Sequence, residues 1–272
     1  MQRRLRSIRL LLATLFFVLA AVYLTMSSHV NSVAAMSEKV QIVPSALGVS
    51  MGVVAVWLVA TFLFGRVYCS TVCPIGAVHD FVIPLRRWIR PLDRPFGYKP
   101  PTRVRWHILA IYLVALVAGL AAVPLWLEPW NIMRNICHSL NPSEAEALWL
   151  NLGISSSVGI LSGVVGLLLI ALCALFTGRG FCTSVCPVGS ALALVARRPV
   201  WQIAIEPDKC INCMKCEEVC PAHCIKVAAR DVDNSRCVRC FDCVEICPNE
   251  AVRFTSSRFR PASPLMRKVK ES

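Results

Sequence analysis

The sequence predicts a mainly α-helical membrane protein that ends in a small, cysteine-rich α+β domain. Three observations lead to this prediction: four long apolar segments, positive charge confined to alternate connections between them, and two tandem cysteine runs near the C terminus. The chain has 272 residues, is 56% hydrophobic and has a mean hydropathy of +0.59. These values are too apolar for a soluble protein of this length and indicate membrane-spanning segments.

Each apolar segment is close to the roughly 20 residues that a helix needs to cross a bilayer. An uncleaved span is expected for the first one, because its apolar run is long for a signal peptide and no small-residue cleavage site directly follows it. Buried helices of a soluble protein are the alternative, but four such lengths with almost no charge argue against it. The four transmembrane helices are expected at residues 10–26, 43–64, 106–126 and 158–176.

The distribution of positive charge predicts the orientation in the membrane. Of the 29 Lys and Arg residues, 27 lie in 1–9, 65–105 and 178–272, whereas the opposite connections hold only Lys39 and Arg134. By the positive-inside rule, both termini and the cysteine runs are cytoplasmic in a multi-pass protein of the inner (cytoplasmic) membrane. This topology accounts for the net charge of +13. We expect no nucleic-acid binding, because no basic stretch is interleaved with aromatic residues.

Two cysteine runs follow the last apolar segment, at residues 210–221 and 237–248. Both have the spacing C-x2-C-x2-C-x3-C-P, in which three cysteines bind one [4Fe–4S] cluster and the fourth binds the other. Structural zinc and disulfides are the alternatives, but zinc usually takes two separated C-x2-C pairs. The expected ligands are Cys210, Cys213, Cys216 and Cys247 for cluster 1, and Cys237, Cys240, Cys243 and Cys220 for cluster 2.

The cysteine-rich domain is small, and about 50 residues bury little apolar core on their own. The clusters are expected to replace that core, so that iron removal unfolds the domain. Short strands are expected near 225–228 and 251–254, and a short surface helix at 191–198. The predicted regions are a four-helix transmembrane domain at 1–198, a ferredoxin-like domain at 199–255 and a basic flexible tail at 256–272, near anionic lipid.

The membrane part contains an internal repeat. F-G-R-V-Y-C-S-T-V-C-P-I-G at 64–76 matches T-G-R-G-F-C-T-S-V-C-P-V-G at 177–189, and each copy directly follows an even-numbered span. The predicted architecture is therefore two parallel helix–loop–helix–CxxxCP units. Their cysteines can together bind metal, as a third iron–sulfur site; the alternative is unligated thiols beside Pro and Gly residues that end helices. These cysteines are Cys69, Cys73, Cys182 and Cys186.

Arg66 and Arg179 occupy matching positions of the repeat, where they either neutralise cluster charge or only mark the cytoplasmic side. Three cysteines remain outside the motifs. Cys173 is expected to be a core residue of the fourth span, and Cys224 a bystander after the first run. Cys137 is expected to be a free thiol, with a disulfide to a partner as the alternative.

A polar stretch at 126–138 is the candidate site for quinone chemistry, which needs a proton-exchanging group at the membrane boundary. Glu128 and His138 can accept protons, Arg134 can donate to a quinone carbonyl, and Trp130, with Trp126, can pack the ring. The alternative is an interfacial aromatic belt with a polar loop. His79 and Asp80 form a second candidate, for which an ordinary helix cap or surface pair is the simpler interpretation.

These spans, motifs and runs together resemble the NapH/MauN family of membrane ferredoxin-type proteins, whose membrane core NosR-like proteins share. The resemblance covers nearly the whole chain and includes W-L-E-P-W-N at 126–131 and R-F-T-S-S-R at 253–258. It implies that quinol is oxidised and that electrons pass towards a periplasmic system, commonly nitrate reductase. The family's functional residues that carry over are the eight cysteines of the runs and the four of the CxxxCP motifs.

The sequence therefore favours a membrane-bound iron–sulfur electron-transfer protein that acts as a quinol dehydrogenase component. Its expected partners are membrane lipid, the quinone pool and an electron-transfer subunit of ferredoxin or cytochrome type. Two other classes remain open. One is a maturation or assembly factor that supplies electrons or reduced metal to a partner enzyme. The other is a redox-sensing regulatory protein.

Overall fold

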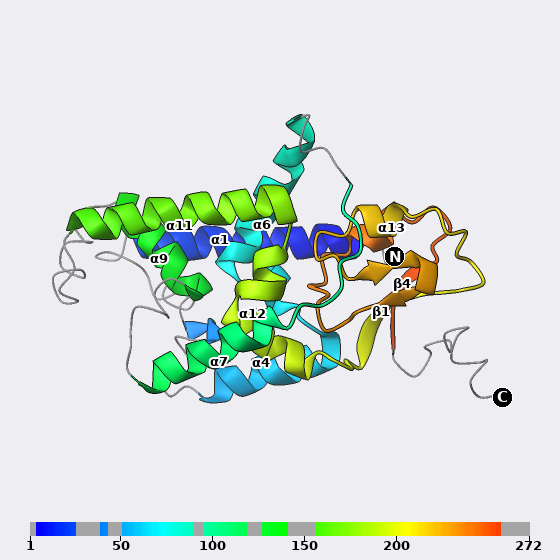
Figure 1. The fold of residues 1–272 in the computed structure, drawn as a ribbon, viewed down its shortest axis with the longest axis horizontal. Helices are drawn as coiled ribbons and strands as arrows, with labels where there is room; N and C mark the ends of the chain where they lie inside the picture. The colour runs from blue at the N-terminus through cyan, green and yellow to red at the C-terminus, as the bar shows by residue number, and fades with distance from the viewer. Residues whose placement is uncertain are drawn as a thin grey trace.

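The computed structural model describes residues 4–25, 39–42, 51–89, 95–118, 127–140 and 156–256. Most helices occupy one end of its long axis and the cysteine-rich domain the other (Figure 1). The helix α1 (Arg4–Thr25) starts at the domain end, where Arg6 forms ion pairs with Asp242 and Glu245. The predicted tail lies outside the described residues from position 257 onwards.

Four helices coincide with the four predicted apolar segments. Among the described residues, one stretch, Arg4–Leu24, is both long and apolar enough to cross a membrane. The other apolar helical stretches are 10–17 residues long, and residues 43–50 and 119–126, which extend two of the predicted spans, lie outside the described part. The number of spans therefore stays a prediction. The four helices are α1, α4 (Met51–Phe64), α7 (Val104–Val117) and α11 (Ser156–Thr177).

Shorter helices carry the two CxxxCP motifs. Each motif begins with one turn of helix and continues into a second helix whose first residue is the motif proline. Proline suits this first position because its missing N–H would have no helical partner there. The prolines therefore begin helices, and do not end them. The elements are α5 (Tyr68–Thr71), α6 (Pro74–Leu85) and η1 (Arg86–Trp88) in the first copy, and η3 (Phe181–Val185) and α12 (Pro187–Val195) in the second.

Two segments of the helical part differ from the interpretations offered for them. The polar loop expected at 126–138 is largely the helix α9 (Pro129–Leu140), which packs on α11 and α1 because Trp130, Met133 and Cys137 recur at helical spacing and are buried. The short helix expected at 191–198 is present as the last part of α12, but it stops at Val195. It contacts α7 and α4, since Leu192 is apolar and buried.

The C-terminal domain contains two small antiparallel sheets. Strand β1 pairs with β4, with Ile205 opposite Val252, and β2 pairs with β3. Strands β2 and β4 lie where short strands were predicted. The bounds are β1 (Trp201–Ile205), β2 (Ile225–Lys226), β3 (Asp231–Val232) and β4 (Val252–Ser256), with the short helices α13 (Lys215–Glu218), η4 (Val227–Ala229) and α14 (Asp242–Ile246).

The domain is bound tightly to the helices. Arg239 is fully buried and donates hydrogen bonds to the carbonyl oxygen of Phe64 at 2.8 Å, at the end of α4, and to that of Trp201 at 3.3 Å. A side chain at Gly65 would meet the Arg239 guanidinium at 2.4 Å, and Gly65 has a φ of +78°, so glycine is required twice over. One contiguous core continues from the CxxxCP motifs into the domain.

Candidate iron–sulfur centres

The four cysteines predicted to bind cluster 1 line a single cavity in the C-terminal domain, together with apolar residues such as Ile211 and Val252. Cys213 is exposed, whereas Cys216 and Cys247 are buried. The cavity encloses about 340 Å³, counting the part that opens to solvent. We call it the outer cavity.

The four cysteines predicted to bind cluster 2 line a second cavity of similar size, and all four are buried. We call it the inner cavity. Each cavity thus receives three cysteines from one run and one from the other, which is the arrangement that the spacing predicts. Four thiols around an apolar cavity fit an iron–sulfur cluster, which takes thiolate ligands.

The two runs fold alike. Three pairs of residues that lie 27 positions apart share the left-handed conformation, which non-glycine residues seldom adopt. These pairs are Asn212 and Arg239, Met214 and Phe241, and His223 and Glu250. The C-terminal domain therefore has an internal pseudo-symmetry that relates the outer and inner cavities.

The inner cavity contains a fifth cysteine that sequence reasoning set aside. Cys224 lines it, is 2% exposed, and its Sγ lies 3.6 Å from the Sγ of Cys220. A hydrogen bond from Cys224 lowers the pKa of Cys237 to about 5, against the opposing effect of burial. The same interaction lowers the pKa of Cys220, while it raises that of Cys224. Cys224 therefore interacts with two of the four cysteines predicted to bind cluster 2.

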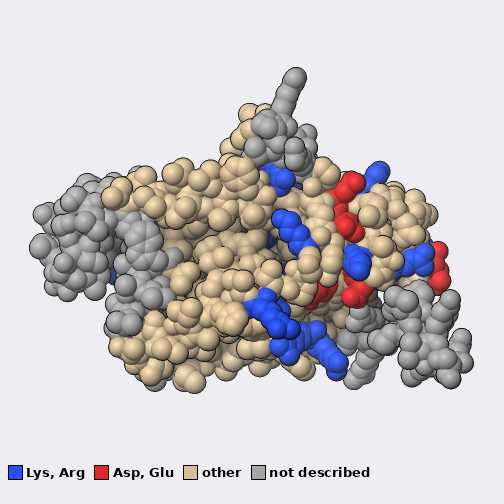
Figure 2. Space-filling model, viewed as in Figure 1, with Lys and Arg blue, Asp and Glu red and all other residues tan. Residues whose placement is uncertain are grey.

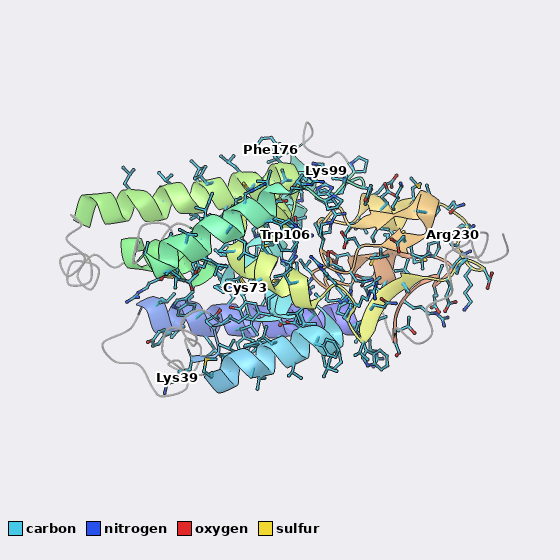
Figure 3. All side chains as sticks on the ribbon, turned by 60° about the horizontal axis from the view of Figure 1, so that its bottom comes forward. Lys39, Cys73, Lys99, Trp106, Phe176 and Arg230 are labelled. Carbon is cyan, nitrogen blue, oxygen red and sulfur yellow. The ribbon has the colours of Figure 1, made fainter. Side chains whose placement is uncertain are left out.

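The four CxxxCP cysteines come together in the helical part, and we call them the CxxxCP quartet. All are buried, within one core cluster, and Figure 3 shows Cys73 deep among the helices. Burial raises the pKa of Cys73, and the charges of the other three cysteines raise it further, which places the four within electrostatic range. Burial also raises the pKa of Cys182 to about 11.

Two fully buried arginines clamp the quartet reciprocally. The guanidinium of Arg66 donates to the carbonyl oxygen of Cys182 at 2.6 Å, and that of Arg179 donates to the carbonyl oxygen of Cys69 at 3.1 Å. Each repeat thus holds the first cysteine of the other. Arg66 also approaches the Sγ of Cys69, at 3.7 Å. The arginines bring positive charge to sites where four thiolates would otherwise repel one another.

Glycines allow the close approach in both motifs. A Cβ atom at Gly76 would lie 2.1 Å from the carbonyl oxygen of Cys69, and one at Gly189 would lie 2.3 Å from that of Cys182. Real Cβ atoms do not come so near a backbone oxygen, so only glycine fits. The agreement between the two copies shows that the two CxxxCP motifs have the same local structure.

The quartet lies next to the inner cavity. The Oγ of Ser70 donates to the carbonyl oxygen of Arg239 at 3.5 Å, and the backbone N–H of Arg179 donates to that of Pro221 at 2.8 Å. Arg179 also interacts electrostatically with both Cys182 and Cys240, one from each site. One buried guanidinium is therefore within electrostatic range of both groups of thiols.

Among the described residues, no three His, Cys, Asp or Glu side chains are grouped to hold a single metal ion. The eight cysteines around the two cavities share this property. A cubane cluster is larger than one ion, so its ligands stand further apart than those of an ion. That the quartet does not form a single-ion site is therefore compatible with a cluster in the same way.

His79 is fully buried and the Asp80 side chain is 14% exposed, so the interpretation as a surface pair is wrong. His79 is fully buried in α6, hydrogen-bonds the carbonyl oxygen of Ile75 at 2.7 Å, and stacks on Phe181. Burial lowers the pKa of His79 to about 4. Asp80 forms ion pairs with both Arg9 and Arg179, which are themselves buried. Partners about 70 and 100 positions away could not be read from the local sequence.

The candidate quinone residues are partly brought together. Glu128 is 2% exposed and accepts a hydrogen bond from Asn131, while its other oxygen has no partner in the described part of the chain. Burial raises the pKa of Glu128 to about 8, although Arg134 opposes this. Trp130 is buried and stacks on Tyr23. Trp126 and the side chain of His138 lie outside what the structure describes.

A buried tyrosine that the sequence did not single out belongs to the same region. The hydroxyl of Tyr112, on α7, is buried without a partner among the described residues, and it interacts electrostatically with Glu128 and Cys186. A single tyrosine in an apolar helix has no local sequence pattern that would mark it as part of a site. Cys173 packs against the core, as expected, and Cys137 is a buried free thiol.

Comparison with known proteins gives these sites a chemical class. A family model described as a 4Fe-4S binding domain matches residues 46–92 and 160–203, one segment around each CxxxCP motif. A second model, described as a 4Fe-4S dicluster domain, matches residues 202–248. No solved structure matches the chain. The fold and the sites therefore define an iron–sulfur electron-transfer protein of the ferredoxin type.

The relatives have names of the same kind. The chain is 28% identical to the ferredoxin-type protein NapH of Escherichia coli, over 57% of this chain and 47% of the relative. It is 30% identical to the methylamine utilization ferredoxin-type protein MauN of Paracoccus denitrificans, over 65% and 56%. The putative electron transport protein YccM of Escherichia coli is 25% identical, over 66% and 48%. The chain spans about half the length of these curated relatives, and it belongs to the family of NapH and MauN ferredoxin-type proteins.

Proposed function

We propose that the protein is a multi-pass membrane protein that takes electrons from quinol and passes them, through iron–sulfur clusters, to a respiratory partner. The observation that carries this proposal is that the buried thiol quartet in the helical part adjoins the buried inner cavity of the C-terminal domain, through hydrogen bonds from Ser70 to Arg239 and from Arg179 to Pro221. The quartet, the inner cavity and the outer cavity form a series of cysteine sites, and the exposed Cys213 extends this series towards solvent. Bound clusters supply one-electron redox steps, and the chain holds their ligands in adjoining sites.

The membrane assignment rests on the surface of the helices. They expose large apolar side chains along their length, for example Leu11 of α1 at 70%, Val114 of α7 at 68% and Leu161 of α11 at 63%. Figure 2 shows that charged side chains on the viewed face gather near the C-terminal domain and leave most of the helical surface free of charge. An apolar surface of this extent fits contact with lipid. We take both termini and the C-terminal domain to be cytoplasmic.

We assign the outer cavity to cluster 1 and the inner cavity to cluster 2, and the quartet to a third cluster. What supports the third cluster is the pair of arginines, because buried cations beside unligated neutral thiols would be costly to desolvate. Thiols with raised pKa values must lose protons when they bind iron, so loading of this site should release protons.

The quinol site is proposed near the start of α9, where Glu128 and Tyr112 of α7 interact. Glu128 has one buried carboxylate oxygen without a partner, and Tyr112 has a hydroxyl in the same condition. Such groups can hydrogen-bond a hydroxyl of a quinol or a carbonyl of a quinone in an apolar setting. With its raised pKa of about 8, Glu128 can accept a proton from quinol near neutral pH.

Reduction by quinol in liposomes tests the proposal. The purified full-length protein is reconstituted with quinol, and cluster reduction is followed by absorbance and electron paramagnetic resonance (EPR). We expect reduction by quinol, and we expect Glu128→Gln to slow it by about 10²-fold, the lower range for loss of a proton acceptor. Glu218→Gln, at an exposed carboxylate, is the control. If dithionite reduces the clusters and quinol does not, the quinol assignment is wrong.

Iron analysis of the full chain tests the third cluster separately. Three [4Fe–4S] clusters contain about 12 iron atoms per chain, and Cys69→Ala with Cys182→Ala should lower this number by about four. An unchanged iron content would remove the quartet from the series.

A further inference from the structure

The inner cavity is lined by five cysteines, one more than a [4Fe–4S] cluster needs. The extra one, Cys224, is as deeply buried as the ligands, and its Sγ lies 3.6 Å from that of Cys220. It also hydrogen-bonds Cys237. Cys224 therefore contacts two of the four predicted ligands and opens on the same space.

The pseudo-symmetry of the domain supplies a direct comparison. Moving 27 positions along the chain takes Cys220 to Cys247 and Cys224 to Ala251. Ala251 lines the outer cavity as Cys224 lines the inner one, and its backbone N–H donates to the Sγ of Cys247 at 3.2 Å. The two positions are equivalent in structure, but only the inner one carries sulfur.

We propose that Cys224 is a fifth thiol of the inner cluster site: it donates its S–H to the thiolates of Cys220 and Cys237, and it can replace Cys220 as a ligand. This rests on the assignment of a cluster to the inner cavity. In the exchange, the Cys224 sulfur forms a bond to iron while the iron–Cys220 bond breaks. The proton of Cys224 moves to the departing Cys220 sulfur, so charge and electrons balance and no oxidant is required.

Hydrogen bonds to cluster sulfurs are one of the factors that set cluster reduction potentials, and they favour the reduced, more negative state. Cys224 should therefore raise the potential of the inner cluster relative to the outer one. Ala251 offers no side-chain donor at the matching place. The same exchange would let the inner site keep its cluster when Cys220 is lost.

Matched alanine variants of the full-length protein test the exchange. Cys220→Ala should keep the iron content and inner-cluster EPR signal near wild type, whereas Cys220→Ala with Cys224→Ala should lose about four iron atoms per chain. In the outer cavity, Cys247→Ala should lose about four iron atoms, and adding Ala251→Cys should restore them. Equal loss of the inner signal in Cys220→Ala and in the double variant would overturn ligand exchange.

A second measurement tests the proposal even if the Cys220→Ala variant does not assemble its clusters. In Cys224→Ala, where all four ligands remain, the midpoint potential of the inner cluster should fall while that of the outer cluster stays the same. Cys224→Ser, which keeps a donor, should restore most of the shift. An unchanged potential would refute the hydrogen-bonding role. If the wild-type protein itself holds fewer than two clusters, the underlying cluster assignment fails instead.

Discussion

The quartet and the two cavities all consist of cysteine thiols, but the structure around the thiols differs. In the C-terminal domain, the two small sheets provide little apolar core, and seven of the eight predicted ligands belong to or border the core cluster itself. In the helical part, buried arginines hydrogen-bond the quartet backbone, and glycines allow its two segments to approach closely. From this difference we predict that the C-terminal domain needs iron to fold, while the quartet is organised by the protein chain itself.

Iron removal should produce the largest difference in stability between the C-terminal domain and the helical part. We expect a chelator under reducing conditions to unfold residues 201–256 but to leave the helices intact, because the clusters occupy the centre of the domain. Limited proteolysis with mass spectrometry, beside circular dichroism, measures both parts in one sample. Simultaneous loss of the α1 and α11 helices would contradict the comparison.

The ion pairs at Asp80 should matter much more than those on the domain surface. Asp80→Asn leaves Arg9 and Arg179 buried without their counter-charge, which typically costs about 3–5 kcal/mol of unfolding free energy. Asp242→Asn breaks the half-exposed Arg6 pair and should cost about 1 kcal/mol or less. Thermal unfolding of the two variants in detergent compares them. Equal losses would mean that Asp80 is more solvated than its surroundings indicate.

The glycine contacts provide a finer test of how the quartet is organised. Gly76→Ala would push a methyl group onto the Cys69 carbonyl, and we expect it to cost about 1–3 kcal/mol. Gly52→Ala, on the open side of α4, meets nothing within 4 Å and should be neutral or stabilising by about 0.5–1 kcal/mol. Denaturation midpoints report both. A tolerated Gly76→Ala would show that the motif backbone can relax around the added atom.

Much of the cysteine chemistry was predictable, because ligand spacing is a local property of the chain. The sharing of Cys220 and Cys247 between cavities follows from the run spacing alone. The role of Cys224 was missed, although comparison with Ala251 at the repeat offset could have revealed it. The helix at 129–140 was also detectable, from Trp130, Met133 and Cys137 at helical spacing.

Other features depend on pairings between distant segments, and no local pattern carries them. The ion pairs of Asp80 join three elements, and the burial of His79 depends on Phe181 from the second repeat. The hydrogen bonds of Arg66 and Arg179 also join segments that are distant in the sequence. The sequence repeat marks Arg66 and Arg179 as equivalent, but it does not say that each crosses to the other copy.

The smallest predicted effect is a pH dependence that only one repeat has. The pKa of His79 is lowered to about 4 from an ordinary 6.5, so between these values the unfolded chain binds a proton that the folded chain does not. Stability should therefore fall as the pH drops through this window, by about 1 kcal/mol between pH 7 and pH 5.5. The second repeat has Leu192 at the matching position, so His79→Leu is the natural comparison. The unfolding free energies of wild type and variant should differ in slope below about pH 6.5 and run parallel above pH 7. Curves that are parallel over the whole range would show that folding does not lower the pKa of His79.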